Sequence, residues 1–189
     1  MAATHPEVLE FLLTRRSRPV PLLRGPGPDR VAMLRLLTAA ARVPDHGKLE
    51  PWRFVVINGA GGAGFAAAIR ARAAITGRDP DKGAGPFEQA PVSVAVVAVP
   101  RDDSKIPQIE QTLSAGAVCL GLVNAALAAG WGATWLTGWP AYDADLLSGA
   151  LGLQPGEWIA GFIHVGTCDA APPDRPRPDV PGLVTWLDA

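Results

Sequence analysis

The chain has 189 residues, of which 48% are hydrophobic, and its formal net charge is −1. This length predicts one domain, residues 1–189, with a sizeable core, and the near-neutral charge argues against nucleic-acid binding by general electrostatic attraction. No uncharged apolar run is long enough to predict a membrane span. The first residues lack the basic and apolar segments of a signal peptide, so we expect a cytoplasmic protein.

The hydrophobic pattern predicts helices that alternate with strands. In chain order, we expect a helix over 6–15, an extended linker over 19–28, a helix between Asp29 and Pro44, a strand over 53–57, a helix over 63–75, a loop through Pro86, a strand over 92–99, and then a helix over 107–129, a strand over 133–137, a helix over 143–151 and a strand over 158–165. This alternation favours an α/β or α+β class with a sheet between helices.

Two features are compatible with a dimer. The helix over 107–129 is apolar around much of its circumference, and the proline-rich tail over 172–189 ends in an apolar segment that includes Trp186. Both could pack within one protomer or against a second copy, and the pattern does not favour either arrangement.

The two cysteines, Cys119 and Cys168, lie far apart and lack metal-ligand spacing, so we expect no metal site. Cys119 falls in an apolar helical pattern and is expected in the core. Neither cysteine is paired locally with a histidine, which argues against a catalytic thiol.

Residues 59–64 match the glycine pattern of a dinucleotide-binding fingerprint between a predicted strand and a predicted helix. The acidic residue expected about 20 positions later, at the end of a second strand, is absent, because Asp79 and Asp81 fall in a predicted loop. We therefore favour a flexible connection over a dinucleotide site.

The segment Arg15-Arg16-Ser17 follows a predicted helix and offers two planar guanidinium groups and a hydroxyl. Such groups suit a phosphate, although this segment alone favours a basic helix end that complements the helix dipole. A second polar segment, residues 43–52, contains His46 and closes on Trp52 before a strand. Residues 135–138 lie at another strand end and could line a pocket.

Taken together, these segments resemble the FMN-dependent nitroreductases of the small, single-domain bacterial type. The resemblance rests on residues 15–17, 41–46, 50–52, 54–57, 114–117, 130–135 and 161–167, which occur in that family's order and with similar spacing. It covers nearly the whole chain, which makes it more specific than any single motif.

The resemblance implies an α+β fold: a three-layer α/β/α sandwich with a mixed central sheet. It also implies a homodimer with two FMN sites at the subunit interface, in which residues 172–189 form an arm that packs on the partner subunit. The implied activity is electron transfer from NADH or NADPH, through FMN, to a nitro compound, quinone or similar flat electrophile by a ping-pong mechanism.

The resemblance also implies site residues, although it assigns no catalytic side chain. The FMN contacts are Arg15, Arg16, Ser17, His46, Glu50, Trp135, Leu136 and Thr137. A stretch assigned to the nicotinamide nucleotide comprises Ala125, Ala126, Leu127, Ala128, Ala129 and Gly130.

Two residues depart from the family's pattern. Glu50 places a carboxylate where close relatives often have glutamine, which should lower the flavin potential or require a neutralising partner such as Lys48. Leu136 stands where relatives often have arginine. These departures leave open a flavin-binding protein with little turnover. A dehydrogenase that uses residues 59–64 is the other alternative.

Overall fold

The computed structural model describes residues 3–170 and 172–187. Its elements, in chain order, are α1 (Pro6–Thr14), the 3-10 turn η1 (Val20–Leu22), α2 (Arg30–Ala40), η2 (His46–Lys48), β1 (Trp52–Asn58), α3 (Ala60–Thr76), α4 (Pro80–Gln89), β2 (Val92–Ala98), α5 (Gln108–Ala128), β3 (Gly132–Leu136), η3 (Trp139–Tyr142), α6 (Ala144–Leu151), β4 (Trp158–Gly166) and α7 (Val180–Leu183). The predicted order of helices and strands is confirmed, apart from residues 76–86.

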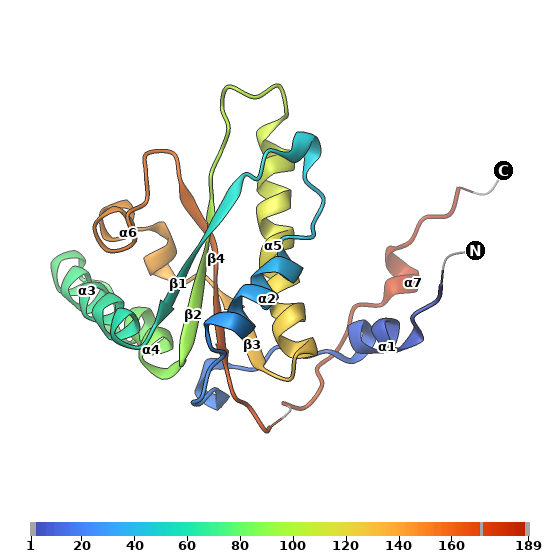
Figure 1. Cartoon of the computed structure of the whole chain (residues 1–189), viewed down its shortest axis with the longest axis horizontal. Helices are drawn as coiled ribbons and strands as arrows, with labels where there is room; N and C mark the ends of the chain where they lie inside the picture. The colour runs from blue at the N-terminus through green and yellow to red at the C-terminus, as the bar shows by residue number, and fades with distance from the viewer. Residues whose placement is uncertain (1–2, 171, 188–189) are drawn as a thin grey trace.

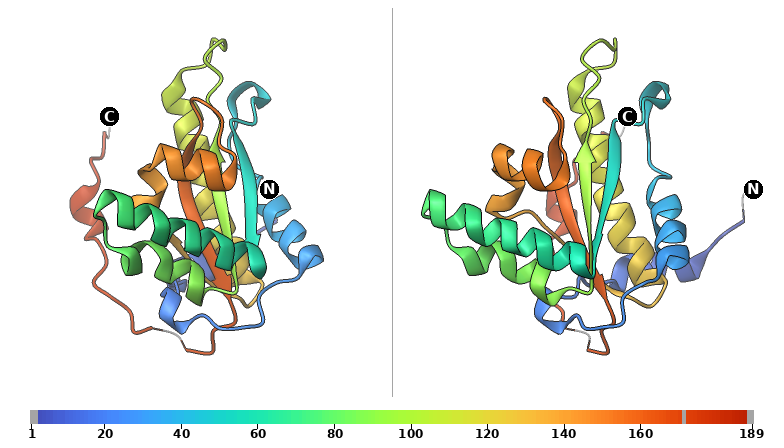
Figure 2. Two further views of the ribbon diagram at one scale, coloured as in Figure 1. Left: turned by 90° about the vertical axis from the view of Figure 1, so that its left-hand side faces the viewer. Right: turned by 60° about the vertical axis from the view of Figure 1, so that its left-hand side comes forward.

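A four-stranded sheet, in the order β1-β2-β4-β3, lies between two layers of helices (Figure 1). On one face, α2 and α5 cover apolar side chains of β2, β3 and β4. The helices α3, α4 and α6 cover the other face (Figure 2) and enclose a second core that contains Phe65, Phe87 and Phe162. This arrangement is the expected α+β sandwich of three layers.

The expected mixed sheet is wrong for the described chain, because all three strand pairings are antiparallel. Two successive helices, α3 and α4, join β1 to β2, so the chain returns to the end of the sheet it left. The single helix α5 does make β2 and β3 run in the same direction. However, β4 inserts between them, so these two strands never pair.

Residues 80–89 form the helix α4 rather than the predicted loop. Glycine and proline lower the helix propensity of this segment, but its N-terminus is well formed. The Asp79 carboxylate accepts hydrogen bonds from Asp81 N–H and Lys82 N–H, and Pro80 occupies the first turn. Phe87 then anchors the helix by edge contacts with Phe65 and Phe162 in the core.

The glycines of residues 59–64 lie mostly inside a helix. Gly59 is the N-cap of α3 at a φ of 50°, and Gly61 and Gly64 are helical. A dinucleotide-binding fingerprint requires a parallel strand–helix–strand unit, whereas β1 and β2 are antiparallel. The structure therefore contradicts the dehydrogenase alternative.

The helix α5 is the central helix of its layer. Ala115, Val118 and Leu122 are fully buried against the sheet. A Cβ at Gly121 would lie 3.1 Å from the carbonyl oxygen of Ala40, so glycine allows α2 to cross closely. By length and composition, α5 is the one described helix that could span a membrane, which is weak evidence because a buried core helix passes the same test.

The helix α1 and the C-terminal arm extend from the body on the side of α2 and α5 (Figure 1). No residue of α1 is buried, and Leu183, Trp186 and Leu187 of the arm are exposed. Residues 188 and 189 of the predicted arm lie outside the described residues. The protomer alone therefore leaves the apolar side chains of both segments uncovered.

Candidate cofactor site

A cavity of about 630 Å³ lies where the segment after α1, the helix α4, the end of β3 and the C-terminal arm meet. Four of the predicted FMN contacts border it: Arg15, Arg16, Ser17 and Leu136. The other cavity-lining cations are Lys82, Arg175 and Arg177. The cavity is thus strongly cationic, as the sequence predicts for residues 15–17.

Local hydrogen bonds hold the segment after α1 in place. Arg15 N–H closes the helix by donating to the Phe11 carbonyl at 2.8 Å, and the chain then becomes extended. Arg18 N–H donates to the carbonyl of Ala133 in β3 at 2.8 Å. The Arg15 guanidinium donates to Ser17 Oγ at 3.1 Å. The basic segment is therefore attached to the sheet.

The arginines of this cavity carry more positive charge than the protein neutralises. The Nε atoms of Arg15 and Arg16 are buried and meet no hydrogen-bond partner within the described residues. Burial, and then the nearby cations Arg177, Arg16 and Arg18, lower the pKa of Arg15 from its ordinary value. Such an arrangement fits a doubly charged phosphate, which would offer acceptor oxygens to these groups.

Sequence reasoning missed Arg175 and Arg177. Asp174 partly neutralises this group, since its Oδ1 lies 2.8 Å from Arg177 Nη2 and 3.8 Å from Arg16 Nη1. The two arginines occur in the proline-rich tail, which was interpreted only as an arm. Their alternation with prolines in an extended segment was the available signal.

A second cavity, of about 350 Å³, adjoins the first and shares Lys82, Pro86 and Leu136 with it. Two more predicted contacts, Trp135 and Thr137, border this second cavity. The Trp135 indole N–H, however, donates to the Ala160 carbonyl at 3.2 Å, and the indole packs over Gly161. The Trp135 indole is therefore held against β4.

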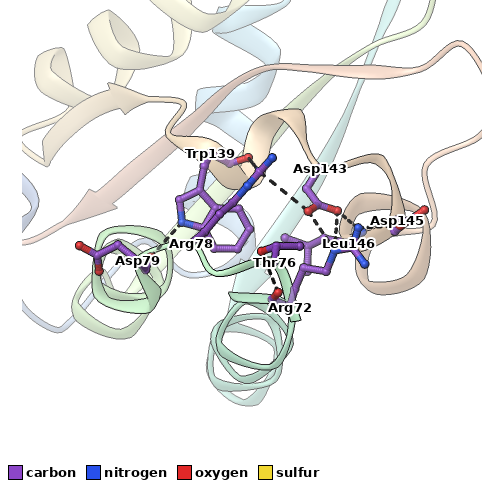
Figure 3. Close-up of polar contacts among 8 residues, drawn as sticks. All are labelled: Arg72, Thr76, Arg78, Asp79, Trp139, Asp143, Asp145 and Leu146. Atoms are coloured by element: carbon purple, nitrogen blue, oxygen red, sulfur yellow. Dashed lines mark hydrogen bonds and ion pairs between the residues drawn. The ribbon is translucent and has the colours of Figure 1, made fainter. Parts of the chain in front are cut away.

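The wall formed by α4 is fastened to the rest of the protein by the contacts in Figure 3. Trp139 Nε1–H donates to the Asp79 carbonyl at 3.0 Å, and the Arg78 guanidinium lies 5.2 Å from the Trp139 ring centre. Arg72 of α3 donates to both oxygens of buried Asp143, whose carboxylate also caps α6 through Leu146 N–H. The Trp139 contact joins the N-terminus of α4 to the segment after β3, and the Asp143 contacts join α3 to α6.

The structure places His46 and Glu50 far from the cationic cavity. His46 Nδ1 contacts Glu110 in the first turn of α5, whereas α1, which leads into Arg15, lies near the opposite end of α5 (Figure 1). Leu127, in the last turn of α5, borders a cavity with Arg15. A 21-residue helix is about 30 Å long, so one small cofactor cannot reach both sets of residues in one protomer.

Hydrogen bonds to Asp45 hold the loop that carries His46 and Glu50. The Asp45 carboxylate accepts hydrogen bonds from Leu49 N–H at 3.1 Å and from Glu50 N–H at 2.8 Å. Lys48 and Glu50 adopt positive φ angles of 54° and 48°, an unusual conformation that side chains tolerate when surrounding contacts impose it. No ion pair joins Lys48 to Glu50 in the described part of the chain, so the suggested neutralisation gains no support.

The stretch assigned to the nicotinamide nucleotide, Ala125 to Gly130, lies at the end of α5. Leu127 and Gly130 border a third cavity, of about 310 Å³, together with Arg15 and Arg16. Ala126, by contrast, is fully buried in the core. Its side chain cannot contact a nucleotide, whereas Leu127 and Gly130 remain accessible from this cavity.

An α+β sandwich with a cationic cavity at a strand end, in which two arginines keep buried Nε groups without a partner among the described residues, defines a protein suited to hold a phosphorylated, partly apolar small molecule. The model of the Nitroreductase family matches residues 14–167. The chain therefore belongs to the nitroreductase family, as its sequence segments predict.

Similar proteins agree with this assignment. The chain is 34% identical over 164 residues to "Putative NAD(P)H nitroreductase YdjA" of Escherichia coli K12, covering 85% of this chain and 88% of that protein. A nitroreductase-like protein of Bacillus cereus has a similar fold, with a TM-score of 0.81, 21% identity and full coverage of both chains. A Desulfovibrio desulfuricans protein solved with FMN has a TM-score of 0.75 and 22% identity, covering 98% of this chain and 100% of that one.

Proposed function

We propose that this protein is an FMN-dependent oxidoreductase that transfers electrons from NADH or NADPH to a nitro compound, a quinone or a similar flat electrophile. The observation that carries the proposal is the pair of buried, unpaired Nε groups on Arg15 and Arg16. Family membership, a relative named for NAD(P)H and a similar fold solved with FMN support the same conclusion.

The chain's own residues would bind and orient the cofactor. Arg15, Arg16, Ser17 and Arg177 would hold the phosphate, since they border the cationic cavity and arginine pairs well with phosphate oxygens. Residues 135–137 would lie along the ring. Bound FMN would supply the electron-transfer chemistry, while the protein supplies position and a shielded face. The nicotinamide and the acceptor would occupy the exposed face in turn, which gives a ping-pong sequence.

We further propose that the working form is a homodimer with composite sites. His46 and Glu50 cannot reach the cationic cavity of their own protomer, so a second copy would bring them there. The exposed apolar side chains of α1, the outer face of α5 and the arm, among them Leu12, Leu113 and Trp186, would be covered in the same interface. Each FMN site would then contain residues from both copies.

Flavin titration tests this proposal. The wild-type protein should bind FMN and quench its fluorescence, whereas Arg15→Ala should bind FMN at least about 10-fold more weakly because a charge-assisted hydrogen bond is lost. Arg35→Ala, an exposed arginine on α2, is the matched control and should bind as the wild type does. A wild-type protein that binds no FMN would exclude the proposed function.

The composite site has a test of its own. His46→Ala and Arg15→Ala should each weaken FMN binding when present in both copies. In a heterodimer with one variant per copy, one site would carry both defects and the other site neither. Tight binding at half of the sites would support the dimer, and uniformly weak sites would contradict it.

A flavin-binding protein with little turnover is the second candidate. It is favoured by the Glu50 carboxylate, which is exposed and has no cationic partner among the described ion pairs. Oxidation of NAD(P)H with a quinone or nitroaromatic acceptor separates the candidates. Turnover that depends on the acceptor excludes the binding-only function.

A further inference from the structure

A buried histidine borders the second cavity. His164 of β4 is 1% exposed and lines the 350 Å³ cavity with Phe87, Pro86 and Leu136. Phe87 contacts the imidazole edge-on, with ring centres 5.1 Å apart. The histidine is therefore held at the floor of a space that continues into the cationic cavity.

The contact with Ser93 defines which imidazole nitrogen carries the proton. Ser93 Oγ lies 2.8 Å from His164 Nδ1, and Ser93 is 2% exposed. The hydroxyl makes no other hydrogen bond among the described residues, so it satisfies its own donor only by donating to Nδ1. The proton of the ring then lies on Nε2.

Burial keeps this ring neutral. It lowers the pKa of His164 to about 4, so near pH 7 the side chain is an uncharged donor. Nε2 meets no acceptor in the described part of the protein. It is also absent from the fully enclosed side-chain atoms that have no partner, so it keeps some access to the cavity. Its N–H is therefore available to a molecule in the cavity.

We propose that the cavity above His164 holds the polar edge of the flavin ring, with Nε2–H donating a hydrogen bond to a ring carbonyl oxygen. This inference rests on the proposed function and adds a cofactor contact to it. The lining of the two cavities suits the two ends of FMN. Arginines line the end suited to the phosphate, Lys82, Pro86 and Leu136 lie where the cavities meet, and the neutral donor of His164 lies at the other end.

Comparing FMN with riboflavin, which lacks the phosphate, tests the contact at the ring end. His164→Phe keeps the aromatic contact with Phe87 but removes the donor. The variant should weaken the binding of both flavins by the same factor, about 5-fold, as expected for one lost hydrogen bond. Arg15→Ala should weaken the binding of FMN much more than the binding of riboflavin. Flavin fluorescence and the visible absorption band provide the readouts, and His5→Phe, at an exposed histidine, is the control.

A second pair of variants guards against a folding defect. His164→Gln retains a donor and should recover most of the affinity. Ser93→Ala frees the imidazole to exchange its proton between nitrogens. This variant should weaken the binding of both flavins equally, by about 2-fold. Thermal unfolding identifies any variant that fails to fold.

Two results would contradict the contact between His164 and the flavin. The first is a folded His164→Phe that binds both flavins as tightly as the wild type does. The second is a His164→Phe variant in which only the KM for the electron acceptor rises, because the cavity would then hold the acceptor. A wild-type protein that binds neither flavin would instead exclude the proposed function.

Discussion

Glu110 Oε2 lies 2.7 Å from His46 Nδ1, although 64 residues separate them in the chain. The carboxylate orients the imidazole, so that Nε2 is directed to other partners. Glu110 is thus a positioning residue for a side chain that the sequence resemblance assigns to the flavin. It was not among the residues predicted from the sequence, because the contact depends on how α5 meets the loop before β1.

We expect Glu110→Ala to weaken FMN binding about 3-fold, because the imidazole loses its orientation, at a cost typical of one hydrogen bond. Glu110→Gln should bind nearly as the wild type does, since its amide oxygen can still accept from Nδ1–H. A double-mutant cycle with His46→Ala is the measurement. Additive effects would show that Glu110 does not act through His46.

Gly61→Ala should stabilise the protein by about 0.5 kcal/mol or less. Gly61 lies in the first turn of α3, where the helix propensity of alanine has less than its full interior effect, and a Cβ there would meet nothing within 4 Å. Chemical denaturation measures the gain. Unchanged affinity for FMN and NAD(P)H would further exclude a dinucleotide fingerprint, whereas a loss of cofactor binding would reinstate one.

Asp143 joins α3 to α6 (Figure 3). Burial alone would raise its pKa, but hydrogen bonds from Arg72 and Leu146 N–H lower the pKa below its ordinary value. We expect Asp143→Ala to lower the free energy of unfolding by about 3 kcal/mol. Arg72 would lose its buried carboxylate partner, and α6 would lose its N-cap. The Asp143 contribution should be present above pH 4 and disappear in stronger acid.

Asp145→Ala is the matched control for Asp143. Asp145 contacts the same Arg72 at 2.6 Å, but its side chain is 77% exposed. Removing an exposed partner should cost less than about 1 kcal/mol. Equal losses in urea denaturation for the two variants would contradict the role assigned to burial.

The sequence predicted the elements whose packing is strongly periodic. The continuous apolar run over 92–99 became β2, which is buried on both faces, and the spaced apolar residues of 107–129 became α5. The helix α4 was missed because its glycines and prolines give it weak local propensity, and tertiary contacts at Phe87 stabilise it. The antiparallel pairing of β1 with β2 goes with a connection made of two helices, α3 and α4. Without α4, the sequence pattern does not predict that connection.

The candidate site was only partly accessible from the sequence. Residues 15–17 offer groups that suit a phosphate, but only the resemblance to the nitroreductases assigns them to the cofactor. Arg177 and His164 were not predicted, since each reaches the cavities only through the fold. Sequence order also could not show that His46 and Arg15 lie at opposite ends of α5 in one protomer.

His164 should make stability depend on pH. The unfolded chain binds a proton on this histidine below about pH 6.5, whereas the folded protein does so only near the lowered pKa of about 4. Stability is therefore greatest above pH 6.5 and falls as the pH decreases, by about 3 kcal/mol when pH 4 is reached. Urea denaturation between pH 7 and 4 measures this slope, and His164→Phe should flatten it. An unchanged slope would contradict the assignment to His164.

The C-terminal arm exposes a large apolar side chain. Trp186 is 76% exposed, and its side chain follows an extended, proline-rich segment. In the proposed dimer the partner subunit would cover it, and apolar burial of this size stabilises an interface by about 2 kcal/mol. We therefore expect Trp186→Glu to raise the dimer dissociation constant about 30-fold. Sedimentation velocity at graded concentrations is the measurement.

Ile75→Glu is the control for the arm. Ile75 is 77% exposed but belongs to α3, in the layer on the opposite side of the sheet from α5. Its substitution should leave the dimer intact. Because Trp186 makes little contact with its own protomer, Trp186→Glu should also leave thermal unfolding of the isolated protomer unchanged. Weaker FMN binding that parallels dissociation would then link the arm to the composite site, whereas an unaltered dimer would show that the arm packs elsewhere.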